Sequence, residues 1–98
     1  MKKIGYHLGA RLDVLKIVEW YERQDGPELA DRFTQELERH IEKLASNPPK
    51  YKDQRSIKRA NLDKFPYHFL YRFINEETIK ILTVKHNRRR PSYGRRRR

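Results

Sequence analysis

The order of apolar and polar positions divides the chain into a short strand, two helices and three further strands. Residues 3–8 form a brief apolar and aromatic run that ends at Gly9, and this run predicts a first strand. Over residues 10–24 apolar side chains recur every three or four positions, which is the spacing of an amphipathic helix. These helical positions are Leu12, Val14, Leu15, Ile17, Val18 and Tyr21.

A second helix is predicted after the Asp-Gly-Pro break at residues 25–27. Pro27 suits the first turn of a helix, and Asp25 is a candidate cap. Steps of four and three then give one apolar stripe. The sequence Ser-Asn-Pro-Pro at residues 46–49 ends this helix, because proline cannot continue it. The stripe consists of Leu29, Phe33, Leu37, Ile41 and Leu44.

The rest of the chain changes to the period of two that is typical of strands. Residues 56–62, 67–74 and 78–85 are the candidates, and Asn-Glu-Glu at 75–77 is the turn that joins the last two as a hairpin. Strands grouped after helices predict the α+β class. We expect one sheet, made of the N-terminal strand and a three-stranded antiparallel meander, with the helical hairpin on one face.

Aromatic side chains alternate along the second of these strands. RNA-binding sheets stack bases on such aromatics, but the helical hairpin also needs an apolar floor. We therefore predict that these side chains line the core. They are Tyr67, Phe69, Tyr71 and Phe73. Of the neighbours Trp20 and Tyr21, one should face the sheet and the other the surface.

Charge is distributed unevenly over the 98 residues, which suffice for a single domain. The formal net charge is +11. Residues 10–46 carry nine acidic and six basic side chains, whereas residues 47–98 carry sixteen basic and four acidic ones. A field of this shape favours an anionic partner, either nucleic acid or an acidic protein.

Several classes of protein are excluded by what the sequence lacks. Without cysteine there is neither a disulfide framework nor a thiolate metal site. The histidines do not have metal-ligand spacing, and no glycine-rich phosphate loop occurs, so we expect no metal, no cofactor and no small-molecule substrate. No apolar stretch is long enough to span a membrane or to serve as a secretory signal, so we expect a cytoplasmic protein without a membrane partner.

Four segments occur in an order and spacing that match a known family. They read VEWYER, RFTQELERHIEKLASNP, RANLDKFPYHFLYRF and ILTVKHNRRRPSYGRR, and the most specific patterns are R-x-x-L-x-x-F-P-Y at 59–67 and V-x-H-x-R-R-x-P at 84–91. Together they resemble the RelE/ParE superfamily of type II toxin–antitoxin toxins, also called plasmid-stabilisation proteins. The resemblance implies the α+β fold predicted above and one toxin domain over residues 1–94, and the run of arginines after Gly94 predicts a disordered basic tail over 95–98.

The resemblance also implies partners. RelE-like members are ribosome-dependent endoribonucleases that cut mRNA, whereas ParE-like members poison DNA gyrase. Both are neutralised by a cognate antitoxin, and the surface residue of the Trp20–Tyr21 pair is expected to border an antitoxin-binding groove. The expected partners are therefore an antitoxin and either gyrase or the ribosome with mRNA.

A metal-independent endoribonuclease would need a base, an acid and cations around the phosphate. Arg59 would bind phosphate, His68 or His86 would exchange protons, and Tyr93 would be the base or a stacking platform. Charge would be stabilised by Arg88 or Arg89. Each residue also has a structural interpretation: His68 half-buried or facing solvent on a strand, His86 bonded to the backbone at a strand end, and Arg59 paired with Glu36 or Asp63.

His68 decides between the two branches, because RelE-like enzymes are understood to carry an arginine at this point of the strand. The resemblance is therefore nearer the ParE-like branch, and we expect growth arrest through binding of a large target such as DNA gyrase. The alternatives are a RelE-like mRNA endoribonuclease and a non-toxic nucleic-acid-binding relative that kept the fold, since fold does not fix function.

Overall fold

A computed structural model describes residues 3–47 and 56–88 of the chain. Its elements follow the predicted order of strand, two helices and three strands, which confirms the α+β class. They are β1 (Lys3–Tyr6), α1 (Leu8–Asp25), α2 (Pro27–Ala45), β2 (Lys58–Asn61), β3 (Tyr67–Asn75) and β4 (Thr78–His86). Strands β1 and β2 are shorter than the pattern indicated, while β3 and β4 are each extended by one residue at the C-terminal end.

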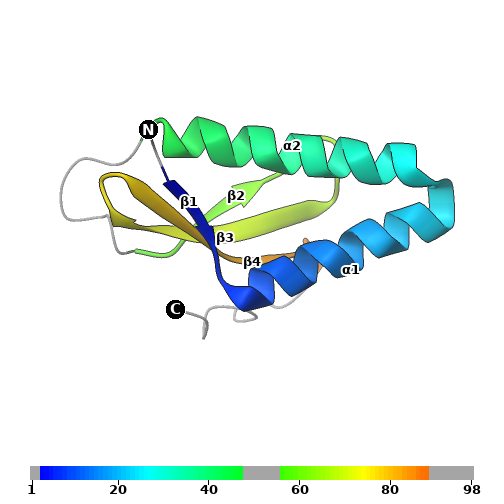
Figure 1. Cartoon of the computed structure of the whole chain (residues 1–98), viewed down its shortest axis with the longest axis horizontal. Coiled ribbons are helices and arrows are strands. Elements are labelled where there is room, and N and C mark those ends of the chain that lie inside the picture. Colours follow the sequence, from blue (N-terminus) through cyan, green and yellow to red (C-terminus); the bar gives the residue numbers. More distant parts are fainter. Residues whose placement is uncertain (1–2, 48–55, 89–98) are drawn as a thin grey trace.

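The four strands form one sheet in the order β1-β4-β3-β2. Strand β1 lies parallel to β4, and β2, β3 and β4 pair as the predicted antiparallel meander. The helical hairpin packs on one face of this sheet, and its turn lies at the opposite end of the molecule from the turn between β3 and β4 (Figure 1). The β2–β3 turn and the C-terminal end of β4 therefore lie beside the middle of the helices.

Helix α2 buries the single stripe that the sequence predicts. Phe33 and Ile41 are fully enclosed, and Leu29 and Leu44 pack at the margin of the core. Pro27 occupies the first turn as expected, but the expected cap at Asp25 is wrong. Asp25 ends α1, and Gly26 precedes α2 with a φ of 86°, a conformation that glycine adopts without steric cost.

Helix α1 differs because its apolar residues fall on two faces. It begins at Leu8, since the Nδ1 atom of His7 accepts the N–H of Gly9 at 3.0 Å and caps the helix. Ile17 and Tyr21 are buried against the sheet, while Trp20 is 50% exposed, so the expected division of the Trp20–Tyr21 pair is confirmed. Three leucines also lie on the surface, each 49% to 69% exposed: Leu8, Leu12 and Leu15.

The core between helices and sheet is aromatic. Phe69, Tyr71 and Phe73 are buried there with Tyr67 packed at its edge, which confirms the predicted floor. The Phe33 ring lies 5.5 Å from both Phe65 and Tyr67, and 5.8 Å from Tyr21. These centroid separations are typical of edge-to-face and tilted aromatic pairs, which add to the stabilisation from buried area. The cluster fixes the start of β3 against both helices.

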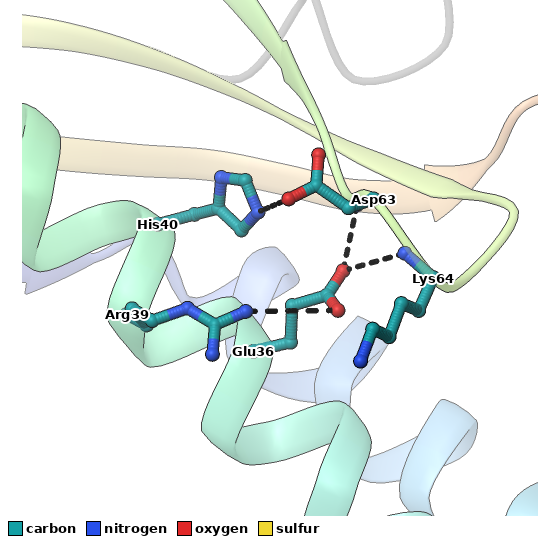
Figure 2. A network of polar contacts seen from close by, with 5 residues as sticks. All are labelled: Glu36, Arg39, His40, Asp63 and Lys64. Carbon is teal, nitrogen blue, oxygen red and sulfur yellow. Dashed lines mark hydrogen bonds and ion pairs between the residues drawn. The ribbon is translucent and has the colours of Figure 1, made fainter.

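Each helix is also tied to the sheet by a carboxylate. Asp13 of α1 accepts the Thr83 hydroxyl at 2.6 Å and the Val84 N–H at 3.1 Å. Glu36 of α2, which is 4% exposed, accepts the N–H groups of Asp63 and Lys64 at 2.7 and 3.1 Å (Figure 2). A backbone amide left unpaired inside a protein costs free energy, so these bonds stabilise the strand and turn that they reach.

Candidate functional site

The predicted site residues lie on three neighbouring strands. Arg59 is in β2, His68 is the second residue of β3, His86 is the last residue of β4, and Arg88 follows it. Arg89 and Tyr93 lie outside the described residues, as does the expected tail at 95–98. The described candidates therefore gather at one end of the β2–β3–β4 meander.

Sheet register places the two histidines on opposite faces. Tyr67 pairs with His86, and His68 pairs with Lys85. Directly opposed residues share a face, and successive residues along a strand alternate between faces. Tyr67 points toward Phe33 of α2, and its ring lies 5.2 Å from that of His86. His86 is therefore on the helix side of the sheet, and His68 is on the other side.

His68 is enclosed and bonded, so the expectation that it is half-buried or faces solvent is wrong. It is 1% exposed, and its Nδ1 lies 2.8 Å from Oδ1 of Asn87, whose own N–H donates to the carbonyl of Pro66. Burial lowers the pKa of His68, the bond to Asn87 opposes that shift, and the charges of Arg59 and Lys85 lower the pKa further. The imidazole is therefore neutral at pH 7, with Nδ1 donating its proton to the amide oxygen.

His86 and Arg59 make local hydrogen bonds at the surface. The Nδ1 atom of half-buried His86 accepts the N–H of Arg88 at 3.2 Å, the backbone bond expected where the strand ends. Arg59 donates from Nε to Oδ1 of Asn61 at 3.0 Å. The expected pairing of Arg59 with Glu36 or Asp63 is wrong, because Arg59 and Asn61 share an exposed edge of β2.

A groove runs between α1 and the end of β4, with a volume of about 230 Å³. We call it the α1–β4 groove. Half-exposed Trp20 forms one wall, held by an edge-to-face contact with Tyr21 at 5.1 Å. Lys16 lies one turn before Trp20 on the same face of α1. Lys16 was not among the predicted site residues, although its spacing from Trp20 was a signal for this groove that the sequence offered. The lining residues are Asp13, Lys16, Ile17, Trp20, Tyr67, Val84, Lys85 and His86.

This arrangement suits binding better than acid–base catalysis. A general acid and a general base must both come within hydrogen-bond reach of the reacting groups. His86 borders the groove, whereas His68 lies on the opposite face of the sheet, enclosed and bonded to Asn87. Within residues 3–47 and 56–88, no three His, Asp or Glu side chains gather closely enough to hold a metal ion. Neither helix of this part is apolar enough to cross a membrane.

The fold and the sequence each match a known class. A solved structure described as the chromosomal ParDE TA system from P. aeruginosa aligns with a TM-score of 0.65 over 88% of this chain and 96% of that one, at 20% identity. This likeness shows a shared fold. The family model for the ParE toxin of the type II toxin–antitoxin system parDE matches residues 4–91, and the chain therefore belongs to the ParE toxin family. A comparison with curated protein sequences finds no match.

Proposed function

We propose that this chain is the toxin of a bacterial type II toxin–antitoxin module, acting in the cytoplasm. It arrests growth by docking on a large target such as DNA gyrase, and a cognate antitoxin neutralises it. Membership of the ParE toxin family supports the toxin role. Docking is favoured over cutting by one observation: His68, at the strand position where RelE-like enzymes carry an arginine, is enclosed and bonded to Asn87 and does not line the α1–β4 groove.

The α1–β4 groove is the proposed centre of the docking surface. Trp20 is the large aromatic side chain most exposed on this side, and tryptophan and arginine carry much of the binding energy at protein interfaces. Lys16 flanks it on α1, and exposed Arg88 follows β4. The positive charge of residues 47–98 adds long-range attraction to an anionic target and increases the association rate.

The antitoxin is proposed to be acidic where it covers the basic half of the chain. Interactions between exposed charges are screened by salt over about 10 Å at 0.1 M ionic strength. Binding of the antitoxin should therefore weaken as salt increases. An affinity that stays flat from low to high salt would indicate that apolar contacts around the helical hairpin dominate instead.

Controlled expression in a bacterium tests the function. The chain is induced alone or with the short reading frame next to its gene, and mRNA 5′ ends are mapped during arrest. We expect arrest that the neighbouring product relieves, without new ends inside codons. New ends at ribosome-bound codons would instead establish the RelE-like endoribonuclease. Normal growth at full expression would establish a non-toxic relative.

A further inference from the structure

A second groove lies on the other helix, between α2 and the turn that joins β2 to β3. Its volume is about 410 Å³, and it shares no residue with the α1–β4 groove. We call it the α2–turn groove. Pockets of this size accommodate a few side chains of a partner. Its lining residues are Leu29, Arg32, Gln35, Glu36, Arg39, Lys64 and Phe65.

Among the lining residues that the structure describes, Glu36 is the one acid, and it is already engaged. The Oε2 atom of Glu36 accepts the N–H groups of Asp63 and Lys64, and Oε1 lies 3.9 Å from the Arg39 guanidinium. Figure 2 shows the Glu36 carboxylate pointing at the turn, with the side chains of Arg39 and Lys64 on either side of it. The carboxylate is thus neutralised by donors within the protein, and the groove keeps an excess of positive charge.

Two of the cations around the groove have no partner in the part of the chain that the structure describes. Arg32 and Lys64 are exposed, and neither side chain makes a hydrogen bond or an ion pair there. Glu28 and Asp31 are near Arg32 in α2, but neither forms an ion pair with it. An anionic group entering the groove would therefore meet unpaired donors from both the helix and the turn.

The groove also has a firm apolar wall. Leu29 and Phe65 are half-buried and pack against the core. The Phe65 ring is held edge-to-face by Tyr21 at 5.4 Å and by Phe33 at 5.5 Å. A rigid wall costs little ordering entropy when a ligand binds. The site therefore combines a preformed apolar surface with two cations that are unpaired among the residues described.

We propose that the α2–turn groove binds an acidic, leucine-containing segment of a partner protein. An apolar side chain of the segment packs against Leu29 and Phe65, and its carboxylates pair with Arg32 and Lys64. A peptide supplies both kinds of group at short spacing, whereas a phosphate backbone would leave the apolar wall without a partner. The proposal concerns a surface separate from the α1–β4 groove and does not depend on the identity of the toxin's target.

Direct titration of the full chain, made by cell-free synthesis, tests the site. The probe is a short fluorescein-labelled peptide of glutamate, aspartate and leucine, followed by fluorescence anisotropy. We expect saturable binding that weakens at least about tenfold in the double variant Arg32→Glu/Lys64→Glu, because two attractive contacts become repulsive. Arg23→Glu/Lys43→Glu is the matched control, because it changes the net charge by the same amount at exposed helix positions outside the groove, and it should change the affinity less than about twofold.

Three further measurements make the result decisive. The peptide with serine in place of leucine should bind more weakly, because it has no apolar side chain to pack against Leu29 and Phe65. A lysine–leucine peptide should bind the double variant better than the original chain, which also shows that the variant is folded. Equal affinity of the acidic peptide for all variants would overturn the proposal. So would a single-stranded oligonucleotide that loses its binding in the double variant while the peptide does not.

Discussion

His68 and His86 lie on adjacent rungs of the same pair of strands, yet their surroundings differ in every respect. His68 is 1% exposed and bonded to Asn87, whereas His86 is half-buried, contacts Tyr67 and borders a groove with an exposed tryptophan. The difference follows from a single step along a strand, because successive side chains point to opposite faces. The comparison indicates that, at the position of the two histidines, the side of the sheet that faces the helices is the more accessible one.

The largest effect on stability should come from the aromatic cluster that packs against the face of the sheet on which His86 lies. Phe33→Ala removes a fully buried ring that contacts Tyr21, Phe65 and Tyr67, and we expect a loss of about 3–5 kcal/mol in the free energy of unfolding. Urea denaturation measures it. Arg59→Ala, on an exposed edge of the sheet, should cost at most about 0.5 kcal/mol. Equal losses of stability in the Phe33 and Arg59 variants would mean that the aromatic cluster does not support the face of the sheet on which His86 lies.

A comparably large effect, on binding rather than stability, is expected at Trp20. Trp20→Ala should raise the toxin concentration needed to inhibit the target at least about tenfold, since a central tryptophan contributes about 2 kcal/mol or more at an interface. The free energy of unfolding should change little, because the side chain is half exposed. Leu12→Ala, also about half exposed on α1 but outside the groove, is the control. Unchanged potency of the Trp20 variant would remove the α1–β4 groove from the docking surface.

A moderate effect is expected at Asp13, which holds the end of β4 against α1. Asp13→Ala leaves the Val84 N–H and the Thr83 hydroxyl without their acceptor, and this should cost about 1–3 kcal/mol in thermal or urea unfolding. Glu19→Ala, an exposed acid on the same helix with one weak ion pair to Arg23, should cost less than about 0.5 kcal/mol. If the two variants lose equal stability, the bonds from Asp13 do not anchor β4.

The smallest effect is a pH dependence carried by His68. Its pKa is lowered in the folded chain, so between that value and about 6.5 the unfolded chain binds more protons. Its contribution to stability is complete above pH 6.5 or so and is lost as the pH falls through the folded pKa. Urea titrations should show a smaller acid-side loss for His68→Gln than for the original chain. Parallel profiles would mean that the neutral imidazole is not linked to folding.

The periodicity of apolar residues was sufficient to predict the fold, but it predicted which face is buried for only one of the two helices. The stripe of α2 has steps of four and three with acids elsewhere, so its burial followed directly. In α1 two apolar faces overlap, and only the packed structure separates buried Ile17 from exposed Leu15. The parallel pairing of β1 with β4 depends on how the hairpin returns the chain to the sheet, which no local pattern specifies.

The site was less predictable because it depends on register. The sequence marks His68 and His86 as candidates equally, and only the pairing of Tyr67 with His86 assigns each to its face. Lys16 joins the groove through helix geometry rather than through any motif. The role of Glu36 was not visible either, since its partners are backbone amides 27 and 28 residues away in the chain.

Supercoiling of relaxed plasmid by purified DNA gyrase is the most direct test of the proposed docking mechanism. The full chain is titrated into the reaction with ATP, and the topoisomers are separated on a gel. The proposal predicts that supercoiling is blocked by the original chain, that Trp20→Ala requires more protein, and that the antitoxin restores activity. The same chain must also arrest growth when it is expressed in a bacterium. If it does, normal supercoiling at saturating toxin would contradict gyrase as the target.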